Sequence, residues 1–312
     1  MPTVTTIDTS VATTNPGDHG YDGFVEVGDA AIVNPGITIA AGGAGAHGIF
    51  SDVAGAQVGV GAGALISSTQ GIGIALTGLL NSTVGASAVL VDGGATVAGA
   101  QFGVTMDGGS NLLISSGTIR GATGVKIGSG NLSSGNIIRQ SASGSMIGTG
   151  TDGTGLMILG DAFVANAGLI QGGGSGIAVA LARAFTLVND GTIRGDTAVN
   201  IGSNVLSTSI VNHGRIEGGM YLGNGNSVYE GRNGSVTGTV SMGNGDDKFF
   251  GGSGAEVVNL GLGNNRIDGG GAAIVVFQRN LADYTIVSNQ DRSFTITAKA
   301  GDTTRFCGTC VR

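Results

Sequence analysis

The residues best suited to chemistry lie in glycine-rich blocks of nine near the end of the chain. These blocks read LGNGNSVYE, MGNGDDKFF, GGSGAEVVN and LGLGNNRID, at residues 222–230, 242–250, 251–259 and 260–268. They match the pattern G-G-x-G-x-D-x-U-x, in which six residues form a turn and three form a short strand with one buried apolar side chain. Glycines let the turn curl so that main-chain carbonyls face inward, and the sixth residue adds a side-chain oxygen. Calcium prefers about six to eight oxygen ligands, so the blocks predict a calcium site.

The sixth position of each block decides which turns carry a carboxylate. It is Ser227, Asp247, Glu256 and Asn265 in chain order. Turns on the same side of a roll are two blocks apart, so Asp247 is expected to share a site with Asn265, and Glu256 to face residues 269–271. Asp247 alone is the expected aspartate, so we predict one or two weak sites, with a Kd of about 10⁻⁴ to 10⁻³ M. The predicted ligands are Gly243, Gly245, Asp247, Gly252, Gly254, Glu256, Gly261, Gly263 and Asn265.

Repeats upstream of these blocks indicate the scaffold that must position them. The segments NAGLIQG, NDGTIRG and NHGRIEG begin at Asn166, Asn189 and Asn212, and degenerate copies recur at intervals of about 20 to 27 residues. Each copy is followed by one or two further short alternating runs. Three strands per unit, each too short to bury a face alone, become stable when successive units stack as coils with parallel pairing.

Alignment of the copies predicts which side chains point into the solenoid. The inward column is Val97, Ile119, Met146, Ile170, Ile193, Ile216 and Val236. The outward neighbours are Ala98, Arg120, Ile147, Gln171, Arg194, Glu217 and Thr237. The three asparagines fall at one corner, where we expect their amides to stack from coil to coil. The repeats predict about nine to eleven coils, one inter-strand spacing of about 4.8 Å apart.

Composition favours the same fold class. The chain holds 63 Gly in 312 residues, no Trp and 41% apolar residues, which is too apolar for a disordered chain. No stretch shows helical periodicity, and Val and Ile suit strands. We therefore predict an all-β protein, a parallel β-helix (solenoid) of about 20–27-residue coils running into a C-terminal parallel β-roll. The predicted segments are an N-terminal cap at 1–36, the β-helix at 37–241, the nonapeptide roll at 242–271, and a strand pair with tail at 272–312.

Several functional classes are disfavoured by the sequence. The formal charge is −7 and the 14 Lys and Arg are scattered, which argues against nucleic-acid binding. Glycine interrupts every apolar run, so no transmembrane segment is expected. The N-terminus lacks a basic region followed by an apolar stretch, so it is not a Sec signal peptide. Cys307 and Cys310 supply at most half a metal site, and we expect them in a frayed tail with reducible thiols.

The nonapeptide blocks resemble the RTX, or hemolysin-type, calcium-binding repeats of Gram-negative bacteria. The resemblance covers about residues 222–300, and ADYTIVSNQDRSFTIT at 282–297 is similar to the strand pair that often follows such repeats. It implies a β-roll folded by calcium and export by a type I system without an N-terminal signal. The expected function is a secreted, non-catalytic calcium-binding structural or surface matrix protein, located outside the cell or at its surface.

Alternative interpretations remain open at this level. The nonapeptides are also compatible with a calcium-free cap, in which case the chain is a calcium-independent secreted adhesin or glycan-binding β-helix. Its extracellular partner is unknown and could be a glycan or another copy of the rod. A polysaccharide lyase or epimerase is the third interpretation, because the predicted strand register places Asp190 beside His213 and Arg194 beside Glu217. Exposed charge pairs of this kind are common on sheets, so we predict no enzyme activity.

Overall fold

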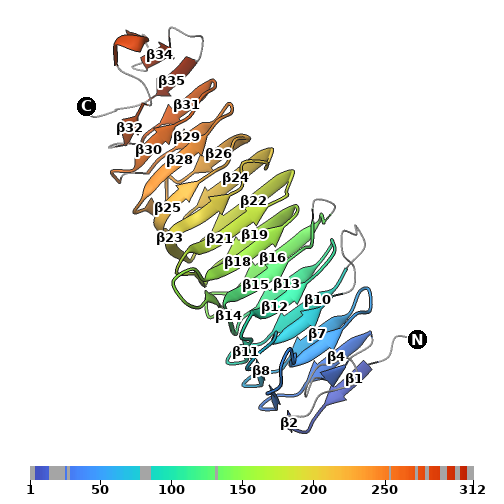
Figure 1. The fold of residues 1–312 in the computed structure, drawn as a ribbon. Coiled ribbons are helices and arrows are strands. Elements are labelled where there is room, and N and C mark those ends of the chain that lie inside the picture. Colours follow the sequence, from blue (N-terminus) through green and yellow to red (C-terminus); the bar gives the residue numbers. More distant parts are fainter. Residues whose placement is uncertain are drawn as a thin grey trace.

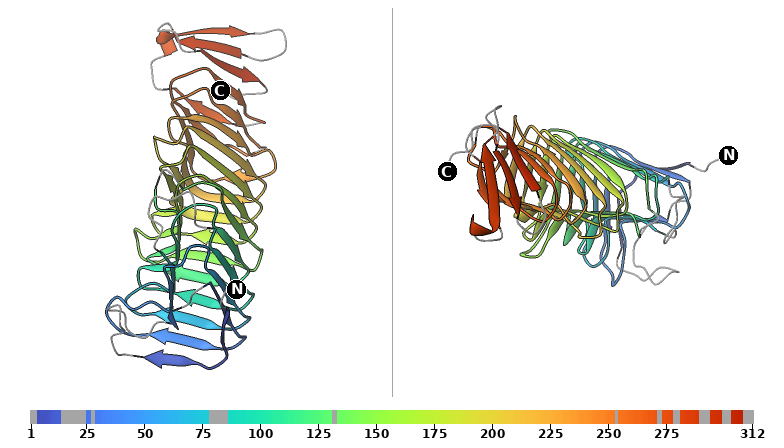
Figure 2. Two further views of the ribbon diagram at one scale, coloured as in Figure 1. Left: turned by 90° about the vertical axis from the view of Figure 1, so that its right-hand side faces the viewer. Right: turned by 90° about the horizontal axis from the view of Figure 1, so that it is seen from above.

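Coils of β-strands stack into a long rod, with β1 at one end and β33 to β35 at the other (Figures 1 and 2). The structure is a computed structural model that describes residues 4–13, 25–26, 29–77, 86–130, 133–252, 254–270, 273–277, 281–288, 294–298 and 303–307. It is an all-β solenoid of about 10 turns with roughly 23 residues per turn. This confirms the predicted fold class and the predicted number of coils.

The strands form three columns that run along the rod, and we call them columns A, B1 and B2. Column A, the first sheet, contains β1 (Val4–Ile7), β4 (Ala30–Val33), β7 (Gln57–Val60), β10 (Ala88–Val91), β13 (Leu112–Ser115), β16 (Asn136–Gln140), β19 (Ala162–Asn166), β22 (Ala184–Asn189), β24 (Ser207–Asn212), β26 (Asn226–Glu230), β29 (Lys248–Phe250), β31 (Asn265–Asp268), β35 (Thr303–Cys307), β34 (Phe294–Ala298) and β33 (Tyr284–Ser288).

Columns B1 and B2 together make the second sheet. Column B1 contains β2 (Val11–Thr13), β5 (Thr38–Ala41), β8 (Leu65–Ser68), β11 (Thr96–Ala98), β14 (Thr118–Gly121), β17 (Ser145–Gly148), β20 (Leu169–Gln171) and β27 (Ser235–Val236). Column B2 contains β3 (Val25–Glu26), β6 (Ile49–Ser51), β9 (Ile74–Leu76), β12 (Phe102–Met106), β15 (Thr123–Ile127), β18 (Thr154–Leu159), β21 (Ser175–Ala180), β28 (Thr239–Gly243), β30 (Val257–Leu260) and β32 (Ile274–Val276). The longer β23 (Thr192–Ile201) and β25 (Arg215–Tyr221) bend through both columns.

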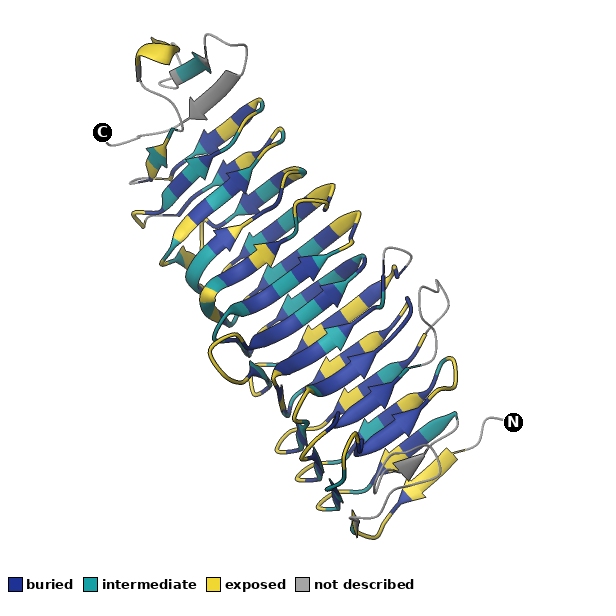
Figure 3. Cartoon of the chain, viewed as in Figure 1, coloured by how far each residue is buried: buried dark blue, intermediate teal, exposed yellow. Residues whose placement is uncertain are grey.

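The predicted inward column is confirmed pair by pair in column B1. The registers join Val97 to Ile119, Met146, Ile170, Ile193, Ile216 and Val236 in that order, all in parallel. From Val97 to Ile216 these side chains are fully buried, and they belong to one continuous apolar core that extends along the whole rod (Figure 3). Stacked apolar side chains therefore connect each coil to the next.

The predicted asparagine ladder is also present, and it is longer than the repeats indicate. Asn166 donates through Nδ2 to Oδ1 of Asn189 at 2.8 Å, and Asn189 donates to Oδ1 of Asn212 at 2.8 Å. Gln140 extends the ladder at one end by donating to Oδ1 of Asn166, and Asn212 donates to the hydroxyl of Tyr229 at the other. Tyr229 then stacks on Phe249 with ring centroids 5.2 Å apart, so the polar column ends on an aromatic pair.

The coils change shape where the ladder ends. Up to β27 each coil contributes to all three columns, but among the described residues no strand of column B1 lies between β29 and β30. Paired residues of column A are 23 apart between β22 and β24, 20 apart between β26 and β29, and 18 apart between β29 and β31. Eighteen residues make two nonapeptides, so these coils have two strands and two short turns.

The strands described near both ends of the chain pair with neighbouring strands of the rod. Within 1–36, the described strands follow the solenoid register, because β1 pairs with β4 and β2 pairs with β5. At the other end, β33 and β34 form the predicted antiparallel pair. The expectation of a frayed tail was wrong for Cys307, because β35 pairs with β34 and also lies parallel to β31. Cys310 and residues 14–24 lie outside the described residues.

Helix is nearly absent from the described ranges, where the one helical element is the 3₁₀ turn η1 (Leu281–Asp283). Accordingly, no helix in the described part of the chain has the length and apolar character that crossing a bilayer requires.

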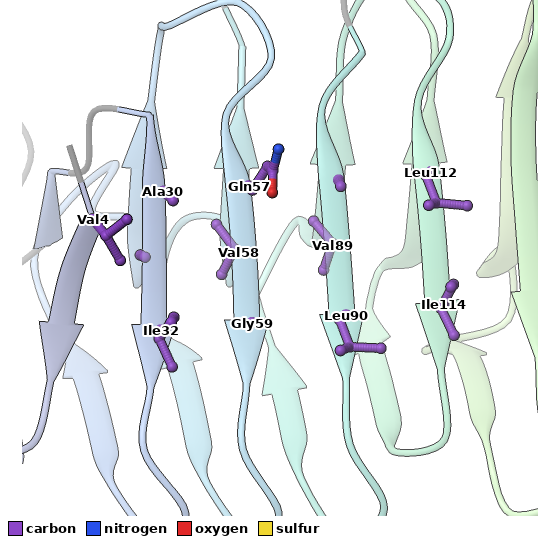
Figure 4. Close-up of a pocket in the computed structure, with 12 residues that line it drawn as sticks. Val4, Ala30, Ile32, Gln57, Val58, Gly59, Val89, Leu90, Leu112 and Ile114 are labelled. Atoms are coloured by element: carbon purple, nitrogen blue, oxygen red, sulfur yellow. The ribbon is translucent and has the colours of Figure 1, made fainter. Parts of the chain in front are cut away.

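An apolar patch lies on the outer face of column A near the N-terminal end. Ile32, Leu90 and Ile114 point outward in register and are between 37% and 48% exposed. Gly59 stands between Ile32 and Leu90 in the same row and leaves an open depression of about 450 Å³ (Figure 4). Alternation does not reveal this patch, because runs such as NLLIS carry apolar residues on both faces of the strand.

Candidate metal site

The nonapeptide turns face one another in the predicted pairs. Turn 244–247 lies against turn 261–264, because the strands that flank them are paired at an offset of 18 residues. A Cβ atom added to Gly261 would lie 1.6 Å from the carbonyl oxygen of Gly243, and one added to Gly263 would lie 2.1 Å from that of Gly245. Such distances exclude any side chain, so these glycines let the main chains of successive coils come together.

Asp247 is buried on the inner side of these turns, with a side chain that is 1% exposed. Its Oδ1 atom accepts a hydrogen bond of 2.8 Å from the backbone N–H of Ser227 in the preceding coil. Its own backbone N–H donates to Oδ1 of Asn265 at 3.0 Å. The structure thus brings together Asp247 and Asn265, as predicted, and stacks them with Ser227 at the sixth positions of three turns.

The second carboxylate oxygen of Asp247 has no partner. Oδ2 is buried, and no hydrogen-bond donor reaches it in the described part of the chain. Burial raises the pKa of Asp247 from its ordinary value of 3.8 to about 7, the hydrogen bond from Ser227 opposes that rise, and the neighbouring charge of Asp246 adds to it. A buried carboxylate in this state is stabilised by a proton or by a cation.

A second ladder runs along the outer side of the same turns. Oδ1 of Asn226 accepts from the backbone N–H of Asp246 at 3.0 Å, and Oδ1 of Asp246 accepts from that of Asn264 at 2.8 Å. The direction is opposite to that of the inner ladder, in which the later coil supplies the acceptor. Consequently the carboxylate of Asp246 accepts from one main-chain N–H on the outer side of the turn, and Asp247 alone supplies an inward carboxylate there.

Glu256 occupies the other side of the roll, away from Asp247. It is 3% exposed, and its Oε1 atom accepts from the backbone N–H of Gly252 at 3.3 Å. Its Oε2 atom is buried without a partner in the described residues. A Cβ on Gly254 would lie 3.3 Å from Oε1, so this carboxylate folds against its own turn. Gly251 donates to the carbonyl of Asp268, which places the turn beside residues 269–270 as predicted.

The donor set is made of hard oxygens with few charges. Within the described ranges, no three His, Cys, Asp or Glu side chains gather in a way that could hold a metal ion. A cation beside Asp247 would therefore take one carboxylate, the amide oxygen of Asn265, main-chain carbonyls and water. Such a set suits Ca²⁺ better than Zn²⁺, which prefers nitrogen and sulfur ligands. The low ligand charge fits the weak affinity that we predict from the sequence.

The charged cluster on the central coils has the predicted pairs. Nδ1 of His213 lies 2.9 Å from Oδ1 of Asp190, and Nε of Arg194 lies 3.6 Å from Oε2 of Glu217. Arg215 also contacts Glu217. The side chains of His213 and Asp190 are 45% and 56% exposed. This arrangement is a solvent-exposed network across parallel strands, and the absence of enzyme activity stays a prediction.

Part of the buried polar framework was not predicted from the sequence. Asn111 and Asn136 form another buried ladder, in which Nδ2 of Asn111 donates to Oδ1 of Asn136 at 3.1 Å. A signal was present, because both asparagines immediately precede apolar strands in successive coils. The hydrogen bond from Asn212 to Tyr229, which ends the longer ladder, had no such signal in the sequence, because it depends on the shortening of the coil.

Comparisons with known proteins do not assign the chain to a family. No protein-family model, no curated protein and no solved structure matches the chain. The resemblance of the nonapeptides to RTX repeats therefore stays a prediction from their sequence pattern.

Proposed function

We propose that this chain is a secreted, non-catalytic structural protein whose C-terminal coils are stabilised by weakly bound calcium. The observation that carries the proposal is the carboxylate of Asp247, buried between stacked glycine turns with one oxygen lacking a partner. A buried carboxylate oxygen without a partner lowers the free energy of unfolding. A calcium ion shared with Asn265 would remove this cost and join two successive coils.

The position of the site suits a structural role. Each coil of a solenoid contacts mainly its neighbours, so an end coil has fewer stabilising contacts than a central one. The two-strand coils lie near the C-terminal end of the rod and lack the asparagine ladder that stabilises the central coils. Calcium would compensate for that loss where the protein enters a calcium-rich medium.

Location and partner rest on the nonapeptide resemblance and on the exposed surface. RTX-like repeats imply a chain that folds after export, which supports an extracellular or cell-surface location. The partner would be another extracellular molecule, a glycan or a second rod, and the apolar patch on column A is one surface on which copies could associate.

Calcium titration tests the proposal directly. We expect calorimetry to show binding with a Kd of about 10⁻⁴ to 10⁻³ M, and about 10 mM calcium to raise the melting temperature measured by circular dichroism. Asp247→Ala is expected to abolish both effects, because it removes the inward carboxylate. The matched control is Asp152→Ala, which deletes an exposed carboxylate in a central coil and should leave calcium binding unchanged.

An unchanged melting temperature in calcium and in EDTA, with no heat of binding, would contradict the proposal. The nonapeptides would then be a calcium-free end of the solenoid, and the chain would be better described as a calcium-independent adhesin.

A further inference from the structure

A polar groove of about 380 Å³ lies on the outside of the C-terminal coils, where column B2 turns towards column A. One wall is the outward row Tyr221, Ser241 and Asn259, which the strand registers place directly above one another in successive coils. The opposite wall includes Asn224 and Asn244 from the adjoining turns. The groove therefore runs along the rod axis and spans about 10 Å across three coils.

The floor of the groove is bare main chain. Gly243 has a φ of +81°, and a Cβ placed on it would lie 1.5 Å from the carbonyl oxygen of Gly223. Gly261 packs on Gly243 in the same way in the next coil. Glycine is thus required at these positions by the packing of the coils, and the missing side chains leave the depression between the two walls.

The walls offer hydrogen-bonding groups of both kinds. Oδ1 of Asn224 accepts from the backbone of Asn244, and Oδ1 of Asn244 accepts from the backbone of Leu262 at 3.2 Å. Since these oxygens are used by the protein, the amide NH₂ groups are the donors left for a ligand. Oδ1 of Asn259 is buried without a partner in the described part of the chain, so the amide NH₂ is the group that Asn259 can offer to the groove. The hydroxyl of Ser241, on the same wall, can accept as well as donate a hydrogen bond.

Tyr221 adds an aromatic surface to these polar groups. It is 36% exposed and lines the groove, so part of its side chain is accessible to a ligand. A tyrosine ring combines an apolar face with a polar hydroxyl. Among the residues that the structure describes, no Asp, Glu, Lys, Arg or His lines the groove. The matching ligand is uncharged, elongated, rich in hydroxyls and apolar on one face.

We propose that this groove binds a neutral oligosaccharide, with Tyr221 stacking on a sugar ring and the amides of Asn224, Asn244 and Asn259 bonding to its hydroxyls. The proposal goes beyond the calcium site. Asp247 lies buried on the inner side of the same turns and does not line the groove. Calcium would affect sugar binding only by ordering these turns.

The test is a glycan array that carries neutral and acidic oligosaccharides, read with the full chain in calcium and again in EDTA. We expect at least one neutral glycan to bind, and calorimetry with that glycan to show affinity lowered about tenfold or more in Tyr221→Ala. The matched control is Asn200→Ala, which changes an exposed residue of the same outward row one coil earlier, outside the groove. It should bind like the wild type.

A second variant separates loss of binding from loss of fold. Asn259→Leu removes the amide that Asn259 offers to the groove without deleting a protein hydrogen bond of Oδ1, so it should weaken sugar binding without lowering the melting temperature. Binding only of acidic glycans, binding of no glycan, or neutral binding that Tyr221→Ala leaves intact would each overturn the proposal. The calcium titration of the Asp247 site is read independently of all three outcomes.

Discussion

Asn189→Ala is expected to lower the free energy of unfolding by about 3 to 5 kcal/mol, because it deletes three hydrogen bonds and leaves the buried Oδ1 of Asn212 unpaired. Asn189 is fully buried. Its side chain accepts from Asn166 at 2.8 Å and donates to Asn212 at 2.8 Å and to the carbonyl of Gly191 at 3.2 Å. The substitution deprives Asn212 of the donor to its Oδ1 atom and leaves a cavity at the corner of the solenoid. Urea unfolding followed by circular dichroism measures the change.

The matched control for this substitution lies in the same coil. Asn200→Ala removes an exposed amide, so it should change the free energy of unfolding by no more than about 0.5 kcal/mol. Equal effects of the two substitutions would show that the ladder contributes nothing beyond main-chain pairing. A large effect of Asn189→Ala alone would show that the ladder stabilises the central coils beyond their main-chain pairing.

The register of the repeats was predictable because it follows from short, constant intervals in the sequence. An apolar residue four positions after each asparagine identifies Ile170, Ile193 and Ile216 as one row, and a period-two strand leaves no other choice of inward face. The same spacing placed Asp190 beside His213 without any structural information. Parallel stacking turns a constant interval in sequence into a constant position in space, which is why these predictions were confirmed.

Other features depend on contacts that spacing does not encode. The strand β35 pairs with β31 across more than thirty residues, and no repeat marks that pairing. Strand β1 lacks the N-x-G motif, so its place in the first coil was not visible. In the candidate site, the sixth positions could be paired from the nonapeptide interval. The opposite directions of the hydrogen bonds in the inner and outer ladders could not be predicted, because neighbouring residues such as Asp246 and Asp247 are identical in type.

Asp247 is expected to make the stability of the calcium-free protein fall as the pH rises. Its pKa is raised from 3.8 to about 7, so the folded state binds the proton more tightly than the unfolded state does. Stability from this group is fully present below about pH 4, is lost as the pH rises towards 7, and then stays level. One proton contributes at most about 1.4 kcal/mol per pH unit. Asp247→Asn removes this dependence and should make the calcium-free protein more stable than the wild type at pH 8.

Comparison of wild type and variant is necessary because another group titrates nearby in pH. Burial lowers the pKa of His47, and that shift has the opposite sign, since stability from a buried neutral histidine is lost as the pH falls. His47 lies in the N-terminal coils and is unchanged in Asp247→Asn. Subtracting the two urea-unfolding profiles from pH 4 to 8 therefore isolates Asp247.

Calcium should narrow the difference in stability between the two proteins at pH 8. A cation takes the place of the proton on the carboxylate, so added calcium is expected to stabilise the wild type at pH 8 and to have much less effect at pH 5. The variant should show no calcium effect at either pH, because asparagine keeps the acceptor for Ser227 but carries no charge. A variant that still gains stability from calcium would exclude Asp247 as the ligand. A wild type that gains equally at both pH values would show that the ion binds without displacing this proton.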